Sequence, residues 1–187
     1  MITCILLAAG SASRFGSQKL LAQLADGRRV VEAAVANLVA ANVGRIVAVT
    51  RRDPALIAVL ENCGCEIVIN ERADQGMGTS IAAGVAATPD ASGWLIALGD
   101  MPAIHSETLS AIARALRNGA RIVVPLMAGR RGHPVGFSAM YGSRLHSLRG
   151  DGGAREILES EAKFIEIVDV DDEGIFADID TPADLKP

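Results

Sequence analysis

The sequence predicts a three-layer α/β fold of Rossmann-like type, with helices on both faces of a mostly parallel, twisted sheet. Short β-branched runs alternate along the chain with amphipathic helical patterns. Most of these runs are apolar at successive positions, which is typical of strands covered on both faces. Repeated strand–helix–strand units imply right-handed crossovers between parallel strands. We expect one domain spanning residues 1–187, because two would be cramped in this length.

The first two thirds of the chain supply the expected parallel strands and their helices. The strand-like runs cover residues 2–7, 45–50, 66–69, 94–98 and 121–126. One face of the first helix carries Val31, Val35 and Leu38, and one face of a later helix carries Leu109, Ile112, Ala113 and Leu116. Ser106 is the expected N-cap of that later helix.

After Leu126 the pattern changes to shorter elements. A turn-rich stretch at 130–134 is followed by a short run at 135–137, which we expect as an antiparallel strand. The later expected elements are a loop at 150–153, a helix at 154–161 and a strand at 164–170. Finally, Thr181, Pro182 and Asp184 predict a helix start with a capping box.

Composition and charge exclude several classes of function. The net charge of −4 and the aromatic content of 3% argue against a nucleic-acid partner. No apolar run reaches the ~18 residues of a membrane span, so we expect no membrane partner. Cys4, Cys63 and Cys65 lack the spacing of a zinc or redox pair, and Cys4 is expected in the core. A reducing cytoplasm fits this cysteine usage.

The loop from Leu7 to Lys19 is the first candidate for a binding site. Ala8, Ala9 and Gly10 follow the first strand directly, so the backbone can approach a phosphate or a base closely. Arg14 and Lys19 add cations suited to a triphosphate. The loop matches neither the P-loop nor Gly-x-Gly-x-x-Gly. An ordinary glycine turn with solvated charges is the alternative.

Acidic residues at two strand ends are candidates for metal binding. Asp100 follows a buried strand, where a carboxylate suits Mg²⁺; the alternative is a cap for the next helix. Asp178 and Asp180 flank Ile179 in an extended segment, so both carboxylates are expected on one face. Two acids so close repel each other unless a cation or water separates them.

The histidines differ in how well their positions suit a function. His133 lies between Gly132 and Pro134 in a loop that must turn sharply, and it is the only histidine that we interpret as functional. His105 and His146 are expected to be structural or exposed.

Residues Leu7 to Lys19 resemble the L-A-A-G-x-S-x-R-M-G-x-x-K signature of nucleotidyltransferases like molybdenum cofactor cytidylyltransferase, also called MobA-like NTP transferases. Later motifs follow in the family's order: Gly99-Asp100-Met101-Pro102, Gly132-His133-Pro134-Val135, Gly150-Asp151-Gly152-Gly153-Ala154-Arg155 and Asp178-Ile179-Asp180-Thr181-Pro182. The resemblance covers nearly the whole chain. It implies a fold like that of the nucleotide-diphospho-sugar transferases.

The resemblance also implies a reaction: the terminal phosphate of molybdopterin attacks the α-phosphorus of CTP, and pyrophosphate departs. It implies Mg²⁺ as cofactor, and a transient contact with a molybdoenzyme or its chaperone. The implied catalytic residues are Arg14, Lys19 and Asp100. The implied nucleotide-binding residues are Leu7, Ala8, Ala9, Gly10, Arg14, Lys19 and Ser80. Asp100, with Asp180 or Asp178, is the implied metal site, and His133 and Asp151 line the acceptor pocket.

The chain departs from the family pattern at two positions. Phe15 replaces a Met, and Ala22-Gln23 stands where a Pro is usual after Leu21. Neither change touches the implied chemistry. Ala8-Ala9, in place of an Ala-Gly-Gly variant, favours cytidine over guanosine by analogy, because the added Cβ leaves less room for a purine.

Other functions remain open at this point. Within the same class, guanylyl transfer or an acceptor other than molybdopterin is the alternative. An NADP-dependent oxidoreductase is supported by Arg51-Arg52 after the second strand, where a 2′-phosphate binds in such enzymes, but the glycine fingerprint is missing. A phospho-acceptor module using Asp100 would need an acidic pair after the first strand, and Ala8-Ala9-Gly10 offers none.

Overall fold

The computed structural model describes residues 1–10, 15 and 18–185 of the chain. Within them one sheet holds eight strands: β1 (Ile2–Ala8), β2 (Arg45–Thr50), β3 (Glu66–Ile69), β4 (Gly93–Leu98), β5 (Ile122–Met127), β6 (Arg130–Arg131), β7 (Val135–Ser138) and β8 (Ile165–Asp169). The strand order is β3-β2-β1-β4-β7-β5-β6, and β8 also pairs with β5. The pairs formed by β1, β2, β3 and β4 are parallel, and β7 lies antiparallel between β4 and β5, as its short apolar run predicts.

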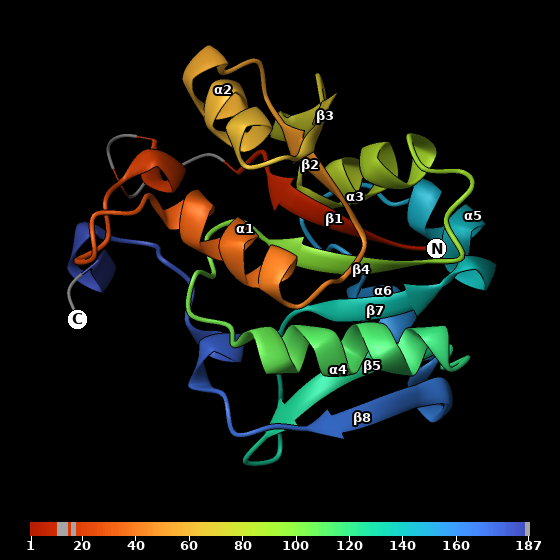
Figure 1. Ribbon diagram of the computed structural model, residues 1–187. Coiled ribbons are helices and arrows are strands. Elements are labelled where there is room, and N and C mark those ends of the chain that lie inside the picture. The colour runs from red at the N-terminus through yellow and green to blue at the C-terminus, as the bar shows by residue number, and fades with distance from the viewer. Residues whose placement is uncertain (11–14, 16–17, 186–187) are drawn as a thin grey trace.

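Helices cover both faces of the sheet (Figure 1). Their bounds are α1 (Val30–Ala40), α2 (Pro54–Asn62), α3 (Met77–Ala86), α4 (Ser106–Arg117), α5 (Gly142–His146) and α6 (Arg155–Ser160). Side chains of α1, α2 and α4 pack with Cys4 and Leu6 of β1 in one core, while those of α3, α5 and α6 pack with Ile5 in another. Successive side chains of β1 thus enter opposite cores, because a strand points them to alternate faces. The predicted three-layer fold is confirmed.

The start of α4 differs from the prediction. Ser106 is the first residue of the helix and His105 is its N-cap, whose side chain makes no capping hydrogen bond. The buried carboxylate of Asp172 acts instead: its Oδ2 accepts from the backbone N–H of His105 at 2.9 Å and from the hydroxyl of Thr108 at 2.6 Å. A distant aspartate thus binds the start of the helix, while the Ser106 hydroxyl donates to Glu107 Oε2 at 3.1 Å.

Only half of the predicted C-terminal capping box forms, and the element that follows is a short 3-10 helix, Pro182–Leu185. The N–H of Asp184 donates to the backbone carbonyl of Thr181 at 3.0 Å, and the Thr181 hydroxyl itself donates to Asp184 Oδ2 at 2.9 Å. Asp184 Oδ2 accepts from the backbone N–H of Thr181 at 2.7 Å and from that of Asp180 at 3.0 Å. These bonds order the turn from Asp180 to Asp184. No helix in the described part of the chain has the length and apolarity to cross a membrane.

Candidate active site

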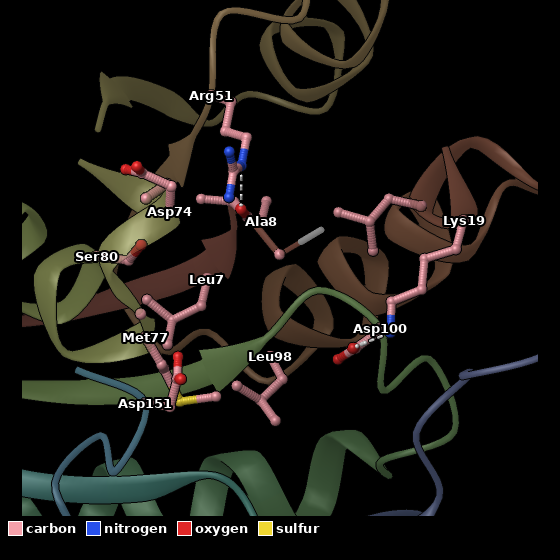
Figure 2. A pocket seen from close by; sticks show the side chains of 15 residues that line it. Leu7, Ala8, Lys19, Arg51, Asp74, Met77, Ser80, Leu98, Asp100 and Asp151 are labelled. Carbon is pink, nitrogen blue, oxygen red and sulfur yellow. Dashed lines mark hydrogen bonds and ion pairs between the residues drawn. The ribbon is translucent and has the colours of Figure 1, made fainter. Parts of the chain in front are cut away.

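A cavity of about 710 Å³ opens at the carboxyl ends of β1, β2 and β4 (Figure 2). Ligands of open parallel sheets bind at this edge. The structure brings together here these residues that the sequence singled out: Leu7, Ala8, Ala9, Gly10, Lys19, Ser80, Asp100 and Asp151. Arg14 lies outside the described residues, so its role stays a prediction. Lys19 and Asp100 lie at one side of the cavity, and Ser80, Met77 and Asp151 at the other.

Hydrogen bonds from neighbouring strand ends fix the backbone of the loop after β1. The carbonyl of Leu7 accepts from the N–H of Gly99 at 2.9 Å, and that of Ala9 accepts from Nε of Arg51 at 2.8 Å. Ala8 and Ala9 are buried, and a Cβ built at Gly10 would meet nothing within 4 Å. The small residues thus form a rigid wall that leaves the space beside them open.

Lys19 joins two acidic residues that are far apart in the sequence. Its Nζ lies 2.7 Å from Oδ2 of Asp100 and 3.1 Å from Oδ1 of Asp180. The backbone N–H of Ile179 donates to the carbonyl of Asp100 at 2.9 Å, which anchors the segment bearing Asp180 beside β4. Burial alone would lower the pKa of Lys19, but hydrogen bonds and charge from Asp100 and Asp180 together raise it above its usual value. The side chain is therefore a fixed cation.

Asp178 and Asp180 have different neighbours. Asp178 lines a smaller hollow of about 220 Å³ together with His133 and Arg131, whereas Asp180 contacts Lys19. Ile179, between them, is buried, as the alternation of an extended segment predicts. The geometry thus brings Asp180, rather than Asp178, to the same cation as Asp100.

The two carboxylates that converge on Lys19 fit a divalent metal ion. Asp100 Oδ2 and Asp180 Oδ1 face one point, and Mg²⁺ typically takes one or two carboxylates together with waters and substrate phosphates. Among the described residues, no group of three or more His, Cys, Asp or Glu side chains is placed to hold a metal ion. The donor set therefore fits a metal whose remaining ligands come from a phosphate and from water.

Ser80 owes its hydrogen-bonding role to Asn70. The Oδ1 of Asn70 accepts from the backbone N–H of Arg72 at 3.0 Å, which can only donate, so the amide Nδ2 faces the other way. Nδ2 donates to the hydroxyls of Thr79 at 2.9 Å and Ser80 at 3.0 Å. Because the Ser80 oxygen already accepts a bond, its proton is available for an acceptor in the cavity.

His133 and Asp151 line one second cavity, of about 270 Å³, with mostly apolar walls. It shares Met77, Leu98 and Asp151 with the larger cavity, so the two adjoin. Burial lowers the pKa of His133 below its usual value. The negative charges of Asp100 and Asp178 act in the other direction but only partly offset the effect of burial. The Nδ1 of His133 is buried and has no hydrogen-bond partner within the described residues. The two residues thus line one cavity, and their role in binding an acceptor stays a prediction.

Sequence reasoning missed three contributors to the site. Arg51 was considered, with Arg52, only as the 2′-phosphate site of the alternative oxidoreductase, but its Nε donates to the loop after β1, while Arg52 pairs with Glu71 at 2.6 Å. Asn70 and Met77 were not predicted as site residues. The sequence did offer a signal for Asn70, because a polar residue directly after an apolar strand needs hydrogen-bond partners if it is buried, as Asn70 is.

Comparisons with known proteins bear on this geometry. Residues 4–164 match the family described as MobA-like NTP transferase domain. The chain is 30% identical to Nicotine blue oxidoreductase from Paenarthrobacter nicotinovorans, over 96% of this chain and 92% of that protein. Two similar solved structures cover 98% of this chain. Rv0371C from Mycobacterium tuberculosis H37Rv, in complex with manganese, has a TM-score of 0.81, 27% identity and 95% of its own chain covered. A nucleotidyl transferase from Methanothermobacter has a TM-score of 0.83 and 25% identity, with 94% of its own chain covered.

The fold and these relationships define an enzyme class, the nucleotidyltransferases. The chain belongs to the MobA-like NTP transferase family. The family resemblance of its sequence motifs is thereby confirmed.

Proposed function

We propose that this enzyme transfers CMP from CTP to the terminal phosphate of molybdopterin, with Mg²⁺ as cofactor and pyrophosphate as the leaving group. The convergence of Lys19, Asp100 and Asp180 at one side of the large cavity carries the proposal. A cation beside a carboxylate pair suits a metal-bound polyphosphate, whose charge must be neutralised as pyrophosphate leaves.

The cavity has room and polarity for a nucleotide laid from one side to the other. Ser80 donates to the base at one side, and Lys19 holds the polyphosphate at the other (Figure 2). The sequence motif adds Arg14 to the polyphosphate site. Asp100 and Asp180 would hold the metal ion, which when bound neutralises phosphate charge and orients the α-phosphorus.

The adjoining cavity is the proposed acceptor pocket. His133 and Asp151 line it, and the apolar side chains of Ile96 and Phe137 give it walls suited to a flat heterocycle. In the transfer, an oxygen of the acceptor phosphate forms a bond to the α-phosphorus, and the bond from that phosphorus to the pyrophosphate oxygen breaks. Positioning of the two substrates is sufficient, and no covalent intermediate on the protein is required.

The base is assigned by analogy, and guanylyl transfer or another phosphorylated acceptor is the alternative. Ala8 and Ala9 line the cavity, where their methyl groups take up space that glycine would leave to a purine. Contact with a molybdoenzyme or its chaperone, and a cytoplasmic location, are further parts of this proposal. The manganese in the similar Rv0371C structure supports a divalent metal.

Pyrophosphate release tests the proposal directly. We expect release from CTP in the presence of Mg²⁺ and molybdopterin, slower release with the other three nucleotides, and none without acceptor. Asp100→Asn is expected to lower turnover on the order of 10²-fold or more, because it removes a charged ligand of the metal ion that neutralises the transition state. Asp171→Asn changes an exposed acid of β8's C-terminal flank and serves as the matched control. Full turnover by Asp100→Asn would exclude the site.

An oxidoreductase is the second candidate, because a relative with 30% identity is named Nicotine blue oxidoreductase. The protein partners of Arg51 and Arg52 speak against a 2′-phosphate site there. Thermal unfolding with ligands separates the two functions. Stabilisation by CTP with Mg²⁺ supports nucleotidyl transfer, and stabilisation by NADPH alone supports oxidoreduction.

A further inference from the structure

A hollow of about 220 Å³ adjoins both cavities of the active site. Leu98, the last residue of β4, lines this hollow and also both cavities, so the three spaces meet at its side chain. His133 lines the hollow and the proposed acceptor pocket. Met101 and Asp178 line it too, and they belong to the two segments that bear the proposed metal ligands. The hollow therefore opens beside the acceptor pocket and beside the proposed metal site.

Two arginines of β6 give this hollow a positive charge. Arg130 and Arg131 both line it. The guanidinium carbon of Arg130 lies 4.4 Å from the centroid of the Phe176 ring, and this contact holds the side chain against one wall. In the part of the chain that the structure describes, the Arg131 guanidinium has neither an ion pair nor a hydrogen bond. Asp178 brings an opposing charge, but its side chain is exposed and water screens it. The hollow therefore suits an anion.

The backbone on the C-terminal side of Arg131 is held at successive residues. The N–H of Gly132 donates to the carbonyl of Pro125 at 3.0 Å, and the N–H of His133 donates to the carbonyl of Ile175 at 3.0 Å. A Cβ at Gly132 would lie 2.6 Å from the Ile175 oxygen, so the chain packs there with no space for a side chain. Arg131 and His133 are therefore presented to the hollow from a rigid backbone.

The ring of His133 complements Arg131 as a neutral hydrogen-bonding group. Its Nδ1 is the ring nitrogen that lies buried without a partner among the described residues, which leaves Nε2 to face a ligand. Because burial lowers the pKa of His133 below its usual value, the imidazole is uncharged at neutral pH. A neutral imidazole can donate one hydrogen bond through Nε2. Arg131 thus supplies the charge at this point, and His133 supplies a directed donor.

We infer that Arg131 binds the terminal phosphate of the acceptor, at the point where Nε2 of His133 can donate to the same phosphate. This inference rests on the proposed function and adds a residue to its acceptor site. The planar guanidinium of an arginine can donate to two phosphate oxygens at once, and a lysine ammonium lacks this fixed geometry.

The proposed reaction requires a cation at this point. The acceptor phosphate is an anion that must come within bonding distance of the α-phosphorus of a polyphosphate, so two like charges meet. Lys19 contacts Asp100 and Asp180 and is proposed to hold the polyphosphate, so the acceptor needs a cation of its own. With the heterocycle in the apolar pocket and the phosphate near Leu98, Arg131 holds the attacking oxygen beside the metal site.

Removing the phosphate from the acceptor, and the arginine from the protein, tests the inference. Wild type and Arg131→Met are each titrated with molybdopterin and with its dephosphorylated form, while Mg²⁺ and the unreactive analogue α,β-methylene CTP fill the nucleotide site. Calorimetry measures the dissociation constants, so the test needs no turnover. We expect Arg131→Met to bind molybdopterin about 10- to 150-fold more weakly than wild type, the range for a hydrogen bond to a charged group. The dephosphorylated form should bind equally well to both proteins.

Further variants separate a contact with the phosphate from a change in structure. Arg131→Lys keeps the charge but loses the planar geometry, so its affinity for molybdopterin is expected to fall between those of wild type and Arg131→Met. Arg114→Met, the same change at an exposed arginine in the last turn of α4, is the matched control and should bind both compounds as wild type does. Because Arg131 does not line the nucleotide cavity, every variant should keep the wild-type affinity for α,β-methylene CTP.

Two results would overturn the inference and leave nucleotidyl transfer intact. One is an Arg131→Met variant that binds molybdopterin as tightly as wild type does. The other is an Arg131→Met variant that loses affinity equally for the phosphorylated and dephosphorylated forms, which would show that Arg131 does not contact the phosphate. A wild-type protein that binds α,β-methylene CTP but neither form of molybdopterin would refute the proposed acceptor, and the inference with it.

Discussion

Ser80 and Asn70 show how a buried neighbour sets the chemistry that a side chain offers to a ligand. Asn70 is 6% exposed, and the backbone N–H of Arg72 orients its side-chain amide. The Nδ2 of this amide donates to the Ser80 oxygen, which is therefore an acceptor. Ser80 is left with a proton to donate. Asn70 is in this sense a positioning residue, since it reaches the cavity only through Ser80.

Reversing this polarity is expected to weaken nucleotide binding. Ser80→Ala removes the donor and should raise the dissociation constant of CTP about tenfold, the value of one hydrogen bond near 1.4 kcal/mol. Asn70→Asp offers only acceptors at this point, so Ser80 would donate to the carboxylate and turn its oxygen toward the base. Asn70→Asp should therefore cost affinity in wild type and little in the Ser80→Ala background. Additive effects in this double-mutant cycle, measured by calorimetry, would contradict the assigned polarity.

At the scale of elements, Asp172 ties the segment after β8 to the start of α4. Its carboxylate, 1% exposed, also accepts from the N–H of Gly174 at 3.0 Å, so it satisfies donors on both sides. Asp172→Ala is expected to lower the free energy of unfolding by about 1–3 kcal/mol, because buried donors are left unpaired. Urea unfolding of this variant, beside the exposed Asp171→Ala, provides the measurement. Equal midpoints for the two variants would refute the role of Asp172.

The α3 helix and the loop bearing Asp151 touch through their backbones. A Cβ at Gly78 would lie 2.8 Å from the backbone N and O of Arg149, and the N–H of Gly78 donates to the carbonyl of Gly150 at 2.8 Å. The close approach holds the backbone beside Asp151, which lines both cavities. Glycine is required at this position for space.

Gly78→Ala is expected to displace that loop. The overlap should cost about 1–3 kcal/mol of stability and raise the KM for the acceptor more than the KM for CTP. Gly152→Ala, where a Cβ meets nothing within 4 Å, is the matched control for stability and should leave thermal unfolding unchanged. Steady-state kinetics with each substrate varied in turn, together with thermal unfolding, measure both effects. An unchanged acceptor KM in Gly78→Ala would show that the loop does not shape the acceptor pocket.

For the whole molecule, the sequence predicts the strands and the sheet that they form better than it predicts hydrogen bonds between side chains that are far apart in the chain. The runs of β1, β2, β3 and β4 are short, apolar and bounded by polar residues, so the sheet and its binding edge follow from local pattern. Ser106 was expected to cap α4 because a local rule favours serine, but it is the first residue of the helix, and Asp172, 64 residues beyond Thr108, accepts from the Thr108 hydroxyl. No spacing rule connects residues so far apart.

The same limit applies to the site. The acids at positions 100, 178 and 180 were recognised by residue type, but sequence gave no means to choose between Asp178 and Asp180. The structure separates them through the backbone bond between Ile179 and Asp100 and through the contact of Asp180 with Lys19. The structural role of Arg51 was not predicted, because its partner, a carbonyl 42 residues away, depends on how β1 and β2 pair.

The central claim is that Asp100 and Asp180 hold a metal ion that carries a nucleotide into the large cavity. Anomalous scattering from crystals grown with Mn²⁺ and α,β-methylene CTP tests it most directly. We expect one anomalous peak within about 2.3 Å of an oxygen from each carboxylate, with the nucleotide reaching from there to Ser80. A peak bound to other side chains, or a nucleotide bound outside this cavity, would contradict the account.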